Sequence, residues 1–189
     1  MIRIGIIGDI GSGKSYVASN FGYPVFNADQ EVSGLYKNNR KTFRSLNKLI
    51  PKYIISFPID KKEISNAILA NKINLKKIVK VVHKEIRKKM KLFLIKNKKR
   101  KIIILDIPLL LENKINNKKD ILIFVDSKKS DIEKKLKKRI NFNKILYNKF
   151  KKIQFTSVYK KKRSNFIIKN NFKKESIKKS IKTILSQIL

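Results

Sequence analysis

The sequence predicts a three-layer α/β fold in which a five-stranded parallel β-sheet lies between layers of helices. Short apolar runs rich in β-branched residues recur along the chain, which is typical of strands buried on both faces of a parallel sheet. Segments with apolar residues every three or four positions accompany these runs, as expected of helices that cover such a sheet. The length of 189 residues suits one core, so we expect a single domain over residues 1–189.

Five apolar segments are the expected strands, and they are residues 2–7, 24–29, 101–106, 121–126 and 165–170. A helix from Lys14 to Gly22 should follow the first strand, because glycine commonly ends a helix. The last helix presents one apolar face, formed by Ile177, Ile181, Ile184 and Ile188. Residues 30–100 have helical patterning and no convincing strand, which predicts a helical insertion.

The composition excludes several classes of protein. A hydrophobic content of 42% excludes wholesale disorder, and the apolar runs are broken too early to span a bilayer. The first residues pass directly into an alternating apolar strand, so we expect no secretory signal. The chain has no cysteine, which excludes disulfides and thiolate metal sites. These features favour a cytoplasmic protein.

The net charge of +35 suggests a nucleic-acid partner, because lysine and arginine neutralise phosphates. The cations are nearly all lysines, however, whereas phosphate recognition favours the planar arginine fork, and they are spread along every expected helix. Lys, Ile and Asn are abundant together, which an AT-rich genome would encode. We therefore expect a solvated basic surface that binds nucleic acid weakly through charge, and a functional basic face is the alternative.

A phosphate-binding loop is predicted where the first strand leads into the first helix. Residues 8–15 read GDIGSGKS, which satisfies the pattern G-x-x-x-x-G-K-[ST] in the strand-to-helix context that it requires. The glycines let backbone N–H groups turn inward around a di- or triphosphate, and the alternative is a glycine-rich turn that binds nothing. Lys14 would reach the β- and γ-phosphates, and Ser15 would offer its hydroxyl to Mg²⁺ as the metal ligand. The expected nucleotide-binding residues are Gly8, Gly11, Ser12, Gly13, Lys14, Ser15 and Tyr16.

The loop indicates a P-loop nucleoside triphosphate hydrolase-like fold that binds a nucleotide with Mg²⁺, but GTPases, ATPases, helicases and small-molecule kinases all share it. The guanine-binding pattern N-K-x-D and the switch pattern D-x-x-G do not occur in a suitable place, which argues against a GTPase. A helicase or a large ATPase needs a longer chain and further motifs. These exclusions favour a kinase that phosphorylates a small molecule.

Five segments follow one another along the chain, and they read IGDIGSGKS, VFNADQ, VVHKEI, LDIPLLLE and RSNFIIKNN. Together they resemble the motifs of the dephospho-CoA kinase family, in the same order, and the resemblance covers residue 2 to about 188. The resemblance implies phosphorylation of the 3′-hydroxyl of dephospho-CoA by ATP, the last step of coenzyme A biosynthesis, with Mg²⁺. The alternatives are another P-loop nucleoside or nucleotide kinase and, from a different class, a nucleic-acid-associated P-loop ATPase.

The resemblance also implies catalytic residues, which are Lys14, Asp29 and Arg139. Asp29 would orient or deprotonate the acceptor hydroxyl, and the alternative is an aspartate that caps the next helix. Arg139 would fold over the triphosphate from a lid at about 137–160, and the alternative is a solvated surface charge.

The resemblance places the substrate, dephospho-CoA, against the insertion at about 30–100 and against the P-L-L-x-E motif. The implied substrate-binding residues are Asp29, His83, Pro108, Leu109 and Glu112. Packing within a helix is the alternative for His83, and strand exit with helix packing is the alternative for residues 108–112. The chain departs from the family's pattern at seven positions. The pattern has glycine at Asp9 and Phe172, aspartate at Asn27, proline at Lys84, basic residues at Ser33 and Ser65, and glutamine at Ile132.

Overall fold

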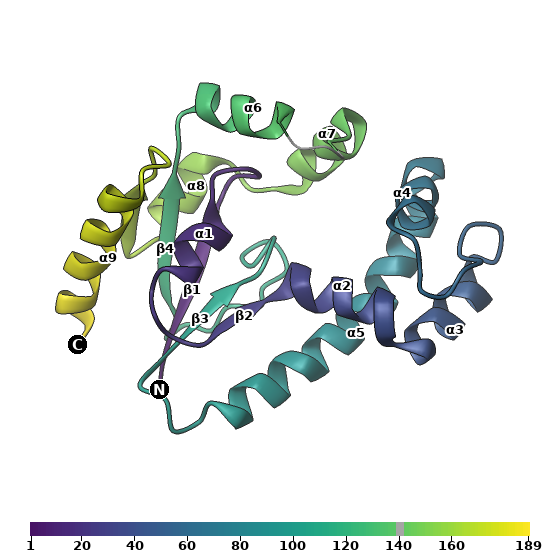
Figure 1. The fold of residues 1–189 in the computed structure, drawn as a ribbon, viewed down its shortest axis with the longest axis horizontal. Coiled ribbons are helices and arrows are strands. Elements are labelled where there is room, and N and C mark those ends of the chain that lie inside the picture. Colours follow the sequence, from purple (N-terminus) through teal and green to yellow (C-terminus); the bar gives the residue numbers. More distant parts are fainter. Residues whose placement is uncertain (139–141) are drawn as a thin grey trace. The chain divides into compact units, whose positions relative to one another are not determined.

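The computed structural model describes residues 1–138 and 142–189, and the chain divides into two compact units (Figure 1). One unit, here called the sheet unit, comprises Met1–Asn27 and Asn97–Leu189. The other, here called the helical unit, is Ala28–Lys96.

The described part of the sheet unit contains one five-stranded parallel sheet with the strand order β2-β3-β1-β4-β5. The strands are β1 (Ile2–Gly8), β2 (Val25–Asn27), β3 (Ile102–Asp106), β4 (Ile121–Asp126) and β5 (Phe166–Lys169). The predicted α/β fold with a five-stranded parallel sheet is confirmed. Strand β1 lies at the centre of the sheet. Its last residue, Gly8, therefore stands at the middle of the carboxyl edge, where open α/β sheets bind ligands.

The helices described in the sheet unit are α1 (Lys14–Ser19), α6 (Lys129–Lys137), α7 (Lys144–Ile153), α8 (Ser157–Lys162) and α9 (Lys174–Ile188). Of these, α1, α8 and α9 contact strands of the sheet. Helices α1 and α9 pack into the same apolar cluster as the inner strands. The expected face of α9 is buried at Ile177, Ile181 and Ile184, and Ile188 is partly buried against the cluster. Burial of each such side chain contributes about 1.5–3 kcal/mol, which fixes these two helices on the sheet.

The first helix and the second strand are both shorter than the sequence predicted. Helix α1 ends at Ser19, and Gly22 takes a left-handed φ of 74° in the turn that follows. Strand β2 ends at Asn27, and α2 (Ala28–Asn38) begins at the next residue. The prediction that the strand continues to residue 29 is therefore wrong, since Asp29 lies in the first turn of a helix.

The helical unit contains α2 and three further helices in its described residues, α3 (Arg40–Leu49), α4 (Lys61–Ala70) and α5 (Lys72–Lys96). Side chains cap the N-termini of α3, α4 and α5. Asn39 accepts from the N–H of Thr42, Asp60 accepts from the N–H of Lys62, and Asn71 accepts from the N–H of Asn74. The apolar core of the unit is formed by Leu35, Leu46, Ile64, Ile68, Ile78 and Val82. No strand occurs between residues 28 and 96.

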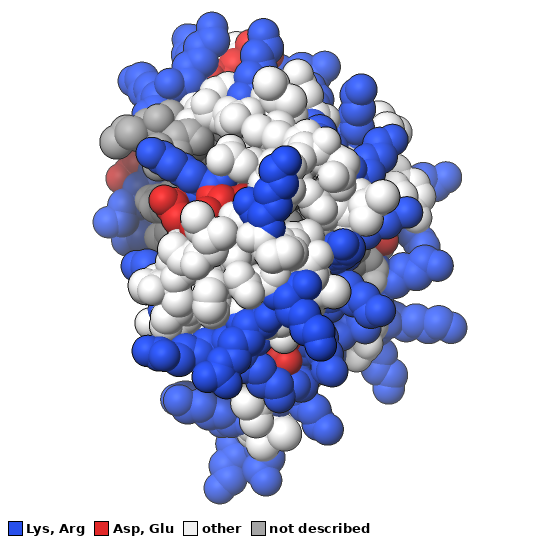
Figure 2. Space-filling model, turned by 90° about the vertical axis from the view of Figure 1, so that its right-hand side faces the viewer, with Lys and Arg blue, Asp and Glu red and all other residues white. Residues whose placement is uncertain are grey.

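Lysine and arginine side chains are spread over the face shown in Figure 2, with few Asp or Glu side chains between them. The whole chain carries 48 Lys and Arg residues against 13 Asp and Glu. Among residues 1–138 and 142–189, no helix combines the length and the apolar character that crossing a membrane would need.

Candidate active site

The loop between β1 and α1 has the backbone shape of a phosphate-binding loop. Gly13 caps α1 with a left-handed φ of 88°, and a Cβ there would collide with the side-chain amide of Asn170. A Cβ on Gly8 would come within 2.7 Å of the Ser12 hydroxyl oxygen and within 2.8 Å of the Val125 carbonyl oxygen. Both positions therefore require glycine, which explains their spacing in the motif.

The neighbouring strands hold this loop through the carbonyl oxygen of Ser12. Ser127, just after β4, donates from its hydroxyl to that oxygen at 2.9 Å, and Asn170, just after β5, donates from its amide at 2.7 Å. Ser12 is 1% exposed. The residues that follow β4 and β5 thus hold the loop in place without a bound nucleotide.

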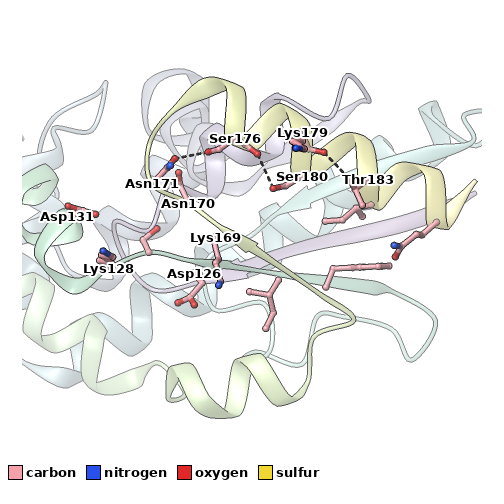
Figure 3. Close-up of a pocket in the computed structure, with 15 residues that line it drawn as sticks. Asp126, Lys128, Asp131, Lys169, Asn170, Asn171, Ser176, Lys179, Ser180 and Thr183 are labelled. Carbon is pink, nitrogen blue, oxygen red and sulfur yellow. Dashed lines mark hydrogen bonds between the residues drawn. The ribbon is translucent and has the colours of Figure 1, made fainter.

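Asn170 also forms the start of a groove that runs along β5 and α9, where Ser176, Ser180 and Thr183 line it (Figure 3). The Asn170 side-chain oxygen accepts from the N–H of Phe172 at 2.8 Å, and Phe172 has a φ of 62°. A positive φ suits glycine, the residue that the family pattern has at this position, and it is strained for phenylalanine.

Lys14 and the first turn of α1 lie next to the loop. The Lys14 ammonium bends back and donates to the carbonyl oxygens of Gly8 at 3.2 Å and Asp9 at 2.8 Å. Ser15 and Tyr16 are exposed in the first turn of α1, and Tyr16 is 42% exposed. A triphosphate would compete for the Lys14 ammonium with the two loop carbonyls.

Asp9, a departure from the family pattern, has partners on α8 that sequence reasoning did not identify. The Ser157 hydroxyl donates to the Asp9 carboxylate at 2.6 Å, and the ammonium of Lys160 lies 3.5 Å from it. Lys160 is 2% exposed. In the sequence this residue is one member of the run KKKR, and nothing in that run distinguishes a buried lysine from a solvated one.

Asp106 is a second residue that sequence reasoning missed. It ends β3, the strand beside β1, is 3% exposed, and accepts a 2.7 Å hydrogen bond from the amide of Asn27. Where the family pattern has an aspartate at position 27, this chain has an amide that donates to the carboxylate. The signal that could have found Asp106 is the apolar run KIIILD, which ends in a carboxylate at a strand terminus.

The segment after β3 folds back toward the loop. Leu109 has a left-handed φ of 57°, and Glu112 accepts from the N–H of Phe155 at 2.9 Å. Leu109 and Glu112 line one small cavity together with Gly8, Lys14, Gln154 and Lys160. Of the predicted residues, Leu109 and Glu112 are thereby brought next to Lys14, whereas Pro108 is half-buried just before them and does not line this cavity.

Two predicted residues belong to the helical unit. Asp29 lies in the first turn of α2, where an acidic side chain interacts favourably with the helix N-terminus. His83 lies in the middle of α5, and its pKa is lowered by burial and, to a smaller extent, by the nearby positive charge of Arg87. Both effects favour the neutral form of the imidazole. Arg139, the predicted lid cation, lies outside the described residues.

The oxygen donors of the sheet unit fit a Mg²⁺ ion that is held mainly by a nucleotide. The Ser15 hydroxyl lies in the first turn of α1, and the Asp106 carboxylate ends the strand beside β1. Mg²⁺ is usually bound by one or two protein oxygens together with phosphates and water. In the part of the chain that the structure describes, no group of three or more His, Cys, Asp or Glu residues could hold a metal by itself.

Comparison with known proteins identifies the family. A family model described as dephospho-CoA kinase matches residues 2–176. The dephospho-CoA kinase of Wolbachia pipientis wMel is 33% identical over 190 residues, which cover 98% of this chain and 97% of that protein. A crystal structure of TT1252 from Thermus thermophilus has the same fold, with a TM-score of 0.78 and 24% identity over 100% of this chain and 98% of that one. The dephospho-CoA kinase of Campylobacter jejuni has a TM-score of 0.65 and 20% identity, over 98% and 96% of the two chains. This chain, whose phosphate loop follows the central strand of a parallel sheet, belongs to the dephospho-CoA kinase family.

Proposed function

We propose that this chain transfers the γ-phosphoryl group of ATP to the 3′-hydroxyl of dephospho-CoA. The observation that carries the proposal is the phosphate-binding loop at the carboxyl edge of the sheet, where Gly8 and Gly13 are required by the backbone and Lys14 lies beside them. The chain that carries this loop matches the dephospho-CoA kinase family model. In the reaction the bond between the γ-phosphorus and the β,γ-bridging oxygen breaks, and ADP leaves with that electron pair. A new phosphorus–oxygen bond forms to the 3′-oxygen, which gives up its proton.

The loop binds the phosphates, and Lys14 follows the migrating group. Phosphoryl transfer passes through a loose transition state with charge spread over three equatorial oxygens, so positioning and charge stabilisation do most of the catalysis. Lys14 would exchange the carbonyl oxygens of Gly8 and Asp9 for phosphate oxygens. Ser15 and Asp106 would hold Mg²⁺, which supplies further charge neutralisation when bound.

Asp29 is the proposed residue that orients the acceptor hydroxyl and takes its proton. Its support is the family resemblance at VFNAD and its place two residues after the end of β2. The first turn of α2 also supports the alternative role, stabilisation of the helix N-terminus. Arg139 is proposed as the lid cation, and residues 28–96 with His83 as the part that binds dephospho-CoA. A cytoplasmic location is part of the proposal, since a chain without cysteine suits a reducing compartment.

An ADP-release assay with ATP and Mg²⁺ tests the proposal across five acceptors, dephospho-CoA, AMP, CMP, adenosine and single-stranded RNA. We expect release well above background with dephospho-CoA and background release with the others. Release with AMP, CMP or adenosine instead would favour another P-loop kinase. Release stimulated by RNA would favour the ATPase that uses the basic surface.

A further inference from the structure

Lys160 is a buried cation that touches the phosphate loop. Its ammonium lies 3.4 Å from the Gly8 carbonyl oxygen and 3.5 Å from carboxylate oxygens of both Asp9 and Glu112. Charge-assisted N–H···O bonds are usually about 2.7–2.9 Å long, so none of these three contacts is a close one. A buried ammonium, which can donate three hydrogen bonds, therefore retains the capacity to bind a nearer anion.

The ammonium groups of Lys160 and Lys14 gather at the same point. Both donate to the carbonyl oxygen of Gly8, at 3.4 Å and 3.2 Å, and both side chains line the small cavity described above. Two cations placed on one carbonyl oxygen repel each other, and the carboxylates of Asp9 and Glu112, each 3.5 Å from Lys160, offset only part of that repulsion. An anion bound beside both ammonium groups would lower the energy further. At a phosphate loop, the anion that fits is the triphosphate.

The carboxylates around Lys160 keep other partners if its ammonium turns toward a phosphate. Asp9 accepts from the Ser157 hydroxyl at 2.6 Å, and its side chain is 38% exposed to water. Glu112 is 7% exposed and accepts from the N–H of Phe155 at 2.9 Å. Neither carboxylate would be left buried without a hydrogen bond, so the movement avoids the main cost of breaking a buried ion pair.

Helix α8 holds Lys160 in place from both ends. Thr156 caps the helix by accepting from the N–H of Tyr159, and Ser157 is tied to Asp9. Beyond the helix, Ser164 donates from its hydroxyl to the Lys160 carbonyl oxygen at 2.7 Å. A cation on such a fixed element is already positioned when the reaction begins.

We propose that Lys160 is a second cation for the transferred phosphoryl group, acting on its oxygens beside Lys14. The proposal rests on the proposed function, because it takes the triphosphate to lie in this loop. A buried, pre-positioned charge is worth most where negative charge develops in a water-excluded site. Because ADP lacks the γ-phosphate, loss of Lys160 should reduce turnover far more than it reduces ADP binding.

The test compares Lys160→Met with a matched variant, Lys162→Met, which removes an exposed lysine of the same helix. We expect kcat at saturating ATP and dephospho-CoA to fall by about a hundred- to a thousand-fold in Lys160→Met, the usual effect of removing one such charge. The dissociation constant for ADP, measured with a fluorescent ADP analogue, should stay within a few-fold. Lys162→Met should retain wild-type values. A kcat for Lys160→Met close to wild type, per folded molecule, would overturn the proposal.

A purely structural role, the neutralisation of Asp9 and Glu112, predicts a different result. The double variant Asp9→Asn, Lys160→Met removes the ammonium together with one of the two carboxylate charges beside it, so it relieves part of the charge imbalance that the loss of Lys160 leaves. If Lys160 acts on the phosphoryl group, the double variant folds and stays slow. Recovery of kcat toward wild type in the double variant would assign Lys160 to charge balance and refute the proposal.

The double variant also covers the case in which Lys160→Met does not fold. Lys160→Arg, which keeps the charge but changes its reach, should retain more of kcat than Lys160→Met does. The wild-type chain separates this proposal from the proposed function. If wild-type protein fails to phosphorylate dephospho-CoA, the proposed function fails. If wild-type protein turns over and the Lys160 variants do as well, the role of Lys160 alone fails.

Discussion

The hydroxyl of Ser157 donates a 2.6 Å hydrogen bond to the carboxylate of Asp9, across a sequence separation of 148 residues. The phosphate loop is therefore tied to α8, a short helix from near the other end of the chain. Asp9 stands where the family pattern has a glycine, so this tie depends on a residue that departs from the pattern. It also places a negative charge beside the site proposed for a triphosphate.

Asp9→Asn should strengthen ADP binding. The variant removes charge repulsion toward the phosphates, while the amide oxygen can still accept from Ser157. Because Asp9 is 38% exposed and screened by water, we expect the dissociation constant for ADP to fall by about two- to five-fold. Fluorescence titration with an ADP analogue would measure it. Asp60→Asn, which removes a charge at the cap of α4, is the control, and an equal gain in that variant would point to net charge alone.

Lys14→Ala should abolish most turnover and leave the fold intact. The Lys14 ammonium contacts loop carbonyls that the sheet already holds through Ser12, so the loop does not depend on it alone. We expect kcat for dephospho-CoA to fall by about a hundred-fold or more, with the thermal midpoint nearly unchanged. Steady-state ADP release and circular dichroism would measure the two. Near-normal turnover in this variant would contradict phosphoryl transfer at this loop.

Asp29→Asn separates the proposed catalytic role from the helix-terminal role. An asparagine keeps the size of the side chain and an oxygen for the helix N-terminus, but it cannot take a proton. We expect ATP affinity and thermal stability to be unchanged and kcat to fall by about a hundred- to ten-thousand-fold. If stability drops while activity per folded molecule does not, Asp29 only stabilises the start of α2.

Asn27→Asp should destabilise the sheet unit at neutral pH. The change replaces an amide that donates to Asp106 at 2.7 Å with a second carboxylate, so a hydrogen bond is replaced by repulsion. We expect a loss of about 1–3 kcal/mol in the free energy of unfolding. Thermal unfolding of the variant and of the wild-type protein measures the loss. Asn148→Asp, the same change at an exposed position of α7, should show little effect.

Tyr36 should ionise well above the ordinary pKa of a tyrosine in the folded protein. Burial raises the pKa of its phenol from the ordinary value of 10.0 to about 12. The folded state thus favours the neutral phenol, and the stabilisation that this gives is present below pH 10 and is lost as the pH rises toward 12. Ultraviolet titration should show one late transition, which Tyr36→Phe should remove. If the variant keeps that transition, another tyrosine is responsible for it.

The inner strands and the phosphate loop were predictable because each is determined by residues that are adjacent in the sequence. The runs at 101–106 and 121–126 are continuous and apolar, and the loop is defined by glycines whose backbone angles require them. The end of β2 was not predictable from such patterns. VFNAD is compatible with a strand throughout, and the start of α2 at Ala28 ends it three residues after it begins.

The contacts around the loop depend on tertiary structure, which no local pattern contains. Lys160 has the same sequence environment as the solvated lysines beside it, and its burial depends on where α8 lies against β1. The pairing of Asp9 with Ser157 joins segments that have no shared motif. Asp106 could have been found, because a carboxylate at the end of a buried parallel strand is a local signal.

The central position of β1 in the sheet has a consequence for the order in which the protein folds as it is synthesised. Its hydrogen-bonding partners are β3 and β4, which begin at Ile102 and Ile121. During synthesis β1 must therefore wait for about a hundred further residues before it has a neighbour on either side, and closing so long a loop is entropically slow. The phosphate loop leaves the ribosome about a hundred residues or more before its anchors at Ser127 and Asn170 do. The enzyme thus acquires the shape of its nucleotide site only when most of the chain has been made.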